Sequence, residues 1–91
     1  MRTVRMHIAG RVQAVGYRAW MIATAAALRL RGWVRNRSDG TVEALVSGSE
    51  EAVAAMIKAC RRGPPAARVT AVKIADAEDD GSPGFTGRPT K

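Results

Sequence analysis

Cysteine and histidine are almost absent from the sequence, whose 91 residues include one of each, Cys60 and His7. A single cysteine cannot form a disulfide within the chain, and such usage is typical of proteins in a reducing cytoplasm. One residue of each kind is also too few for a zinc site of the usual composition. We therefore expect a protein that needs no metal and no other cofactor.

Long apolar runs are also missing. No stretch approaches the ~18 consecutive apolar residues of a membrane span, and no apolar run of the length found in secretory signals follows residues 1–5. Aromatic residues make up 4% of the chain and lack the pattern with which RNA-binding modules stack bases. We expect a cytoplasmic protein whose partners include neither a membrane nor a nucleic acid.

The length and composition favour a small globular domain. Hydrophobic residues account for 46% of the chain and charged residues for 25%, which is an ordinary balance. A chain of 91 residues leaves room for one domain, spanning residues 1–91, with one modest core and one shallow site. A large buried cofactor pocket is not expected, and we expect a monomer.

The positive charge is unevenly distributed. The formal net charge is +7 and the sequence pI is about 11.1. Residues 1–40 contain eight arginines and one acid, Asp39, whereas residues 41–91 contain seven basic and seven acidic residues. The whole excess lies in the first 40 residues, so anions should be drawn there.

The spacing of apolar residues predicts five strands and two helices. Val4, Met6 and Ile8 alternate with polar residues, as in a half-buried strand, and Asp39-Gly40 is a strong signal for a hairpin turn. The predicted elements are a strand over 2–9, a loop over 10–16, a helix over 17–31 ended by Gly32, strands over 33–37 and 41–47, a helix that begins after Ser49 and ends before 63–65, a strand over 68–75, a loop over 76–84 and a short edge strand over 85–88.

This order of elements predicts an α+β, ferredoxin-like sandwich. It is β-α-β-β-α-β with a short C-terminal edge strand, and such a chain forms an antiparallel sheet with two helices on one face. The same fold serves enzymes, RNA-binding proteins and regulatory modules, so the function has to be inferred from the site.

The loop over 10–16 has the features of an anion site. Backbone N–H groups at a helix N-terminus attract anions, and Gly10 and Gly16 allow successive amides to converge on one oxyanion. Arg18, in the first helical turn, adds a planar guanidinium that can hold two oxygens of a phosphoryl or carboxylate group. The loop has no Walker A or GxGxxG pattern, so a nucleotide is not implied. The alternative is a plain connection with a solvated Arg18.

Asn36 is the second candidate residue. The strand that contains it is predicted to lie in the same sheet as the first strand, so Asn36 can face the mouth of the loop. Its amide both donates and accepts hydrogen bonds and can hold a water beside a bound phosphoryl group. The alternative is a polar residue that simply lies near a hairpin.

Taken together, these segments closely resemble the motifs of the acylphosphatase family, and the resemblance extends over essentially the whole chain. The family pattern is Gly-x-Val-Gln-Gly-Val-x-Phe/Tyr-Arg, then Gly-Trp-Val-Lys/Arg-Asn, then x-x-Asp/Gly-Gly, with a closing Phe-x-x-Arg-Pro. The corresponding segments are Gly10-Arg11-Val12-Gln13-Ala14-Val15-Gly16-Tyr17-Arg18, Gly32-Trp33-Val34-Arg35-Asn36, Asp39-Gly40, and Gly84-Phe85-Thr86-Gly87-Arg88-Pro89.

The resemblance implies a small cytoplasmic hydrolase that splits acyl phosphates into a carboxylate and inorganic phosphate. By position, Arg18 matches the phosphate-binding arginine of the family and Asn36 its water-orienting asparagine. Inorganic phosphate or sulfate would bind as product or competing anion. The amides that cradle the phosphate would be those of Arg11, Val12, Gln13, Ala14, Val15 and Gly16.

Ala14 departs from the family pattern, which has glycine at this position. If the loop requires a positive φ there, alanine costs roughly 1–2 kcal/mol. Gly16 could relieve part of that strain.

The implied reaction requires few protein groups. An acyl phosphate is a mixed anhydride whose leaving group is a carboxylate of low pKa, so no general acid is needed to expel it. The loose transition state of phosphoryl transfer asks mainly for positioning and charge stabilisation. Arg18 and the loop amides would supply these without a metal ion.

The remaining candidate residues favour structural roles. We expect His7 at the surface, Cys60, Trp20, Trp33 and Tyr17 in packing, Arg35 and Arg37 on a solvated strand face that could steer anions, and residues 78–80 in a solvated loop.

Two other functions stay open at this point. One is a non-catalytic domain that binds phosphate or carbamoyl phosphate within a larger assembly. The other is an RNA-binding ferredoxin-like domain, which would suit the net charge of +7 but requires exposed aromatic residues on the sheet.

Overall fold

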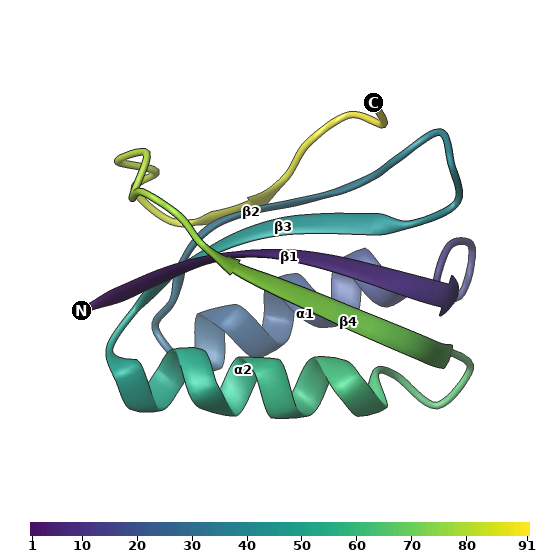
Figure 1. The fold of residues 1–91 in the computed structure, drawn as a ribbon, viewed down its shortest axis with the longest axis horizontal. Coiled ribbons are helices and arrows are strands. Elements are labelled where there is room, and N and C mark those ends of the chain that lie inside the picture. The colour runs from purple at the N-terminus through teal and green to yellow at the C-terminus, as the bar shows by residue number, and fades with distance from the viewer.

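Two helices cover one face of a five-stranded sheet in the computed structural model, which describes all of residues 1–91 (Figure 1). The predicted α+β ferredoxin-like fold is confirmed. Neither helix has the length and hydropathy needed to span a bilayer. The elements in chain order are β1 (Arg2–Arg11), α1 (Tyr17–Ala27), β2 (Arg31–Asn36), β3 (Val42–Gly48), α2 (Glu50–Arg62), β4 (Arg68–Asp76) and β5 (Phe85–Gly87).

The strand order in the sheet is β4-β1-β3-β2-β5. β3 pairs antiparallel with β1 on one side and with β2 on the other, so β1 and β2 run in the same direction. The C-terminal ends of β1 and β2 therefore lie at the same end of the sheet (Figure 1). The predicted edge strand is confirmed, and it pairs parallel with β2 as the one parallel pair in the sheet.

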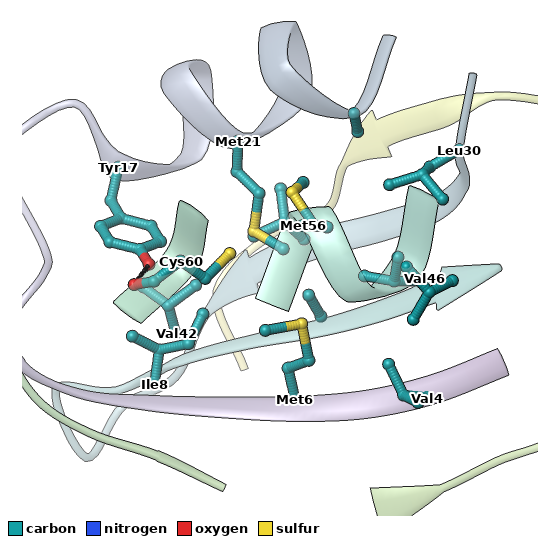
Figure 2. Close-up of a cluster of buried hydrophobic side chains, with 14 of the residues drawn as sticks. Val4, Met6, Ile8, Tyr17, Met21, Leu30, Val42, Val46, Met56 and Cys60 are labelled. Carbon is teal, nitrogen blue, oxygen red and sulfur yellow. Dashed lines mark hydrogen bonds between the residues drawn. The ribbon is translucent and has the colours of Figure 1, made fainter. Parts of the chain in front are cut away.

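The core lies between the sheet and the two helices (Figure 2). Alternate residues of β1 and β3 point into it, as the period of two along a strand requires. Tyr17 donates a hydrogen bond from its hydroxyl to the carbonyl of Cys60 at 2.6 Å, which joins the start of α1 to the end of α2. Burial raises the pKa of the Cys60 thiol to about 11, as suits a packing residue. The predicted packing roles of Tyr17 and Cys60 are thus confirmed.

The first helix is shorter than predicted. It ends at Ala27, and Arg29 adopts a left-handed conformation with φ 57°. Leu30 N–H bonds to the Ala25 carbonyl and Arg29 N–H to the Ala26 carbonyl, the pattern of a Schellman motif with Arg29 in the place usually taken by glycine. This turn directs Leu30 into the core, where it is 3% exposed.

Gly32 has a different role from the predicted one. It lies within β2 with φ 136°, and a Cβ there would overlap the carbonyl of Leu45 on β3. Glycine is therefore needed for the close approach of two strands, and the prediction that it ends the helix is wrong.

The second helix follows its predicted signals. Ser49 is the N-cap and accepts a hydrogen bond from the N–H of Ala52 at 3.1 Å. Two acids occupy the first turn and two arginines the last, which complements the helix dipole. Gly63 closes the helix with φ 69°.

Glu43 is the centre of an ion cluster on the open face of the sheet, opposite the helices. Its carboxylate is 4% exposed and accepts hydrogen bonds from Arg5 at 2.8 Å, Arg35 at 2.7 Å and Arg37 at 3.0 Å. His7 Nε2 lies 3.4 Å from Glu43 Oε2. Burial raises the pKa of Glu43, but the guanidinium hydrogen bonds outweigh burial and lower that pKa to about 2. The prediction that Arg35 lies on a solvated strand face was wrong, because its side chain is only 16% exposed.

The acidic loop after β4 is exposed but is also paired. Asp79 forms an ion pair with Arg31, which lowers the pKa of the Asp79 carboxyl. Asp80 accepts a hydrogen bond from Trp33 Nε1 at 3.1 Å and lies 3.5 Å from Arg88. These contacts fasten the loop over β2, so the prediction of a solvated loop was incomplete.

Substitution of Glu43 by glutamine is expected to flatten the dependence of stability on acid pH. A carboxyl with a pKa near 2 in the folded chain and about 4.3 unfolded stabilises the fold above pH ~4.5, and that stability is lost as the pH falls towards 2. The contribution at pH 7 is about 3 kcal/mol. Urea unfolding at pH 7 and pH 3 measures both effects. The control is Glu78→Gln, whose exposed side chain has no ion partner; an equal response of both variants would contradict the argument.

Candidate functional site

The two predicted site segments meet at one end of the sheet. Residues 12–16 connect β1 to α1, and Asn36 is the last residue of β2. Both follow strands that run in the same direction, which places the loop and the β2–β3 hairpin at the same end of the molecule (Figure 1). The sheet topology therefore brings together residues that are about 20 positions apart in sequence.

The loop backbone turns sharply at two positions. Ala14 has φ 59° and Gly16 has φ 79° with ψ 16°, and Gly16 is the N-cap of α1. The conformation expected from glycine in the family pattern is thus adopted by alanine. Because an L-residue in this region costs roughly 1–2 kcal/mol, Ala14 is a point of strain in the loop.

The amides of this region are free to bind an anion. None of the backbone N–H groups of residues 12–19 donates to a backbone carbonyl, and the N-cap of α1 has no side-chain hydrogen bond. The first backbone bond of the helix runs from Trp20 N–H to the Gly16 carbonyl. A run of open N–H groups at a helix N-terminus is a suitable cradle for a phosphoryl group.

A hollow of about 340 Å³ adjoins these amides. Arg18 is its one charged lining residue and is exposed, and it forms no ion pair within the chain. Its guanidinium is therefore available to an anion. The lining residues are Val12, Ala14, Gly16, Tyr17, Arg18, Ala19, Ile22, Asn36 and Gly87.

Asn36 contributes the second functional side chain of the hollow. Its Oδ1 atom is buried and has no hydrogen-bond partner within the protein. Its backbone carbonyl accepts a hydrogen bond from Lys91 N–H at 3.0 Å, which secures the end of β2. Because Asn36 also lines the same hollow as Arg18, its side-chain amide is available to bind a group such as water there.

Gln13 joins the loop to the β2–β3 hairpin. Its Nε2 donates to the carbonyl of Arg37 at 2.8 Å and to the carbonyl of Thr41 at 2.9 Å. These two residues flank the predicted turn at Asp39-Gly40, where Gly40 N–H bonds back to Arg37. The side chain of Gln13 therefore sets the distance between the loop and the strand that carries Asn36.

The other predicted loop residues point elsewhere. Arg11 is the exposed last residue of β1 and pairs with Arg68 across the sheet, while Val15 packs against the core. Neither lines the hollow, so any role in anion binding would belong to their backbone.

Four lining residues were not among the predicted site residues. Tyr17 and Ala19 belong to the first turn of α1, Ile22 lies one turn further along, and Gly87 is contributed by β5. The spacing of Ile22, four residues after Arg18, could have indicated a shared helix face. Gly87 could not have been placed by local sequence, because only the β2–β5 pairing brings it here.

A larger hollow, of about 820 Å³, lies beside the C-terminus of α2. It is bounded by Trp20, Pro64 and Pro65 and carries Lys58 and Arg62. None of the open N–H groups or the unpartnered Asn36 oxygen faces it. We therefore place the candidate site at the smaller hollow, where the polar groups converge.

The chain is similar to known proteins over most of its length. Residues 4–86 match the family model described as acylphosphatase. The chain is 51% identical over 90 residues to the acylphosphatase of Rhodospirillum rubrum, with 99% of each chain covered. It is 54% identical over 83 residues to the acylphosphatase of Acidiphilium cryptum, with 91% of each covered.

Similarity extends to a solved structure. The crystal structure of acylphosphatase from Bacillus subtilis superposes with a TM-score of 0.93 at 35% sequence identity. The match covers 97% of this chain and 99% of that chain. The residues matched by the family model, 4–86, include the loop, Arg18 and Asn36.

Replacing Ala14 by glycine is expected to stabilise the fold by about 0.5–1 kcal/mol. Relief of left-handed strain outweighs the extra entropy of the unfolded glycine chain, and Ala14 is exposed, so no packing is lost. The midpoint of urea unfolding measures the change. Ala23→Gly, at an exposed position inside α1, is the matched control and should destabilise by about 1 kcal/mol. Destabilisation by Ala14→Gly would contradict the strain argument.

Replacing Gln13 by methionine is expected to lower the free energy of unfolding by about 1–2 kcal/mol. The variant keeps the side-chain length but loses both hydrogen bonds to the hairpin. Amide hydrogen exchange should also quicken in residues 12–16, because the loop is released from the hairpin. Unchanged exchange and stability would show that the two bonds do not hold the loop.

Proposed function

The chain belongs to the acylphosphatase family, and from this premise we propose that Arg18, Asn36 and the loop amides carry out hydrolysis of acyl phosphates at the smaller hollow. The products are a carboxylate and inorganic phosphate. The curated relatives are matched over nearly their whole length, which favours an enzyme that acts by itself over a binding module within a larger assembly.

Arg18 and the amides hold the phosphoryl group. The guanidinium binds two of its oxygens, and the open N–H groups of the loop and of the first turn of α1 bind the rest. As the bond from phosphorus to the carboxylate oxygen breaks, charge on these oxygens is met by donors that are already in place. This preorganisation avoids the cost of reorienting solvent.

Asn36 positions the attacking water. Its Oδ1 accepts a hydrogen bond from the water and holds it in line with the leaving carboxylate. The water oxygen bonds to phosphorus, the bond to the carboxylate oxygen breaks, and the water proton passes to a phosphoryl oxygen of the substrate. The carboxylate leaves without protonation because its conjugate acid has a low pKa.

One observation favours hydrolysis over simple anion binding. Asn36, whose buried Oδ1 has no partner within the protein, and Arg18, whose guanidinium is unpaired, line the same hollow, next to a run of open backbone N–H groups. A water acceptor and an anion cradle side by side are what hydrolysis requires, whereas simple anion binding does not require the acceptor.

The RNA-binding alternative is not favoured by the sheet. Trp33 is the aromatic residue on its open face, and it is only 4% exposed. The guanidinium carbons of Arg35 and Arg88 lie 4.7 and 4.8 Å from its ring centroid, so the ring is covered and cannot stack a base.

We expect the enzyme to work as a monomer in the cytoplasm, with no nucleic acid or membrane partner. The chain buries its one cysteine, and its exposed surface contains Met1 as its one large, highly exposed hydrophobic residue, which offers no apolar interface. Sedimentation equilibrium should give the mass of a single chain across micromolar concentrations; a dimer mass would refute this expectation.

The assignment of roles is tested by two substitutions. Arg18→Ala should lower kcat for acetyl phosphate by a factor of about 100 to 1,000, and so should Asn36→Ala. The two differ in binding: Asn36→Ala should retain competitive inhibition by inorganic phosphate, whereas Arg18→Ala should lose most of it. Assays in EDTA show whether turnover is independent of divalent metal.

Arg61→Ala is the matched control for lost charge. Arg61 is exposed on α2 and lies outside the hollow, so its loss should leave kcat within about twofold. Near-normal turnover by Arg18→Ala or by Asn36→Ala would remove that residue from the mechanism, and phosphate binding without turnover by the native chain would favour the non-catalytic alternative.

A further inference from the structure

We propose that the site prefers acyl phosphates whose acyl group is apolar and uncharged, held against a wall formed by Ala19, Ile22 and Gly87. We call these three residues the acyl wall. The inference rests on the proposed function and adds to it the class of acyl group that is accepted.

The hollow is larger than a phosphoryl group requires. Its volume is about 340 Å³, and a water-sized group takes about 30 Å³. A phosphoryl group together with its bridging oxygen has five heavy atoms and would therefore fill less than roughly half of the space. The remainder is available to the part of the substrate on the other side of the bridging oxygen.

The acyl wall begins where the anion cradle ends. Ile22 lies four residues after Arg18 on the same face of α1, which places it ~6 Å further along the helix axis. Gly87 of β5 adjoins it, since a Cβ on Gly87 would lie 3.5 Å from Ile22 Cδ1, so helix and strand form one continuous surface here. A substrate whose phosphoryl group is bound by Arg18 can thus lay its acyl chain along this surface.

This part of the hollow offers no partner for a second charge. Arg18 is the one charged residue among the lining residues and is assigned to the phosphoryl group. Tyr17 donates its hydroxyl to the Cys60 carbonyl and presents only its ring. A carboxylate on the acyl group would lose solvation without gaining a cation, whereas each methylene gains by leaving water.

The test is a series of substrates assayed at 0.15 M ionic strength. At this salt concentration the Debye length is about 8 Å, which limits the long-range attraction of anions by the basic residues. kcat/KM is measured for acetyl, propionyl, butyryl and succinyl phosphate. We expect a rise of roughly two- to fourfold for each added methylene. Succinyl phosphate carries a carboxylate where butyryl phosphate has a methyl group, and it should be about tenfold poorer than butyryl phosphate.

Two pairs of variants locate the preference. Ile22→Ala should reduce the gain per methylene to below about 1.5-fold, whereas Ile57→Ala should retain the native gain. Ile57 is likewise partly buried against the core but lies outside the hollow, so it controls for lost packing. Ile22→Lys should raise the ratio of succinyl to butyryl phosphate about tenfold, because it adds a cation to the acyl wall.

Ala23→Lys is the control for that added charge, since Ala23 is exposed on α1 and does not line the hollow. It should leave the ratio unchanged. Equal kcat/KM for all acyl groups, or a native preference for succinyl phosphate, would overturn the acyl wall while leaving the hydrolase in place. Failure to hydrolyse any of the four substrates would instead refute the proposed function.

Discussion

The parallel alignment of β1 and β2 on either side of β3 is the constraint on which the site depends. Each strand pairs antiparallel with β3, so the loop after β1 and the end of β2 are fixed at one end of the sheet. The core between sheet and helices holds that register, because a slip of one residue would turn every core side chain outward. The approximate placement of the site groups is thus a consequence of sheet topology.

Two side chains refine the placement that the topology provides. Gln13 donates hydrogen bonds to the carbonyls of Arg37 and Thr41 and so connects the loop over residues 12–16 to the hairpin beside Asn36. Tyr17 bonds to the Cys60 carbonyl and fixes the first turn of α1 against α2. The residues proposed for chemistry thus lie on a backbone held from both sides, as preorganised catalysis requires.

Local sequence predicted much of this molecule, and the exceptions have physical reasons. Alternation in β1, the Ser49 cap and the Asp39-Gly40 turn were sufficient for the elements they define, because each signal acts over a few residues. The predicted end of α1 was wrong. Burial of Leu30 favours a left-handed conformation at Arg29, a position at which glycine is usually expected. The Glu43 cluster and the contribution of Gly87 to the hollow depend on strand pairing between distant segments, which no local pattern contains. Arg18 and Asn36 could be named because both belong to motifs, and their proximity follows from the predicted strand order.

The outer edge of β4 has a consequence for self-association. This strand of nine residues is the last in the sheet, and one of its sides leaves N–H and C=O groups available to a strand from another molecule. Arg68, Lys73 and Asp76 interrupt it with charge, which opposes the flat apolar contact that edge-to-edge pairing needs. At the opposite edge, β5 is only three residues long, and Pro89 follows soon after it. Charge therefore protects the long edge strand β4 from pairing with another chain, and the short length of β5 protects the opposite edge. Neutralising the charges on β4 would make the protein prone to aggregation.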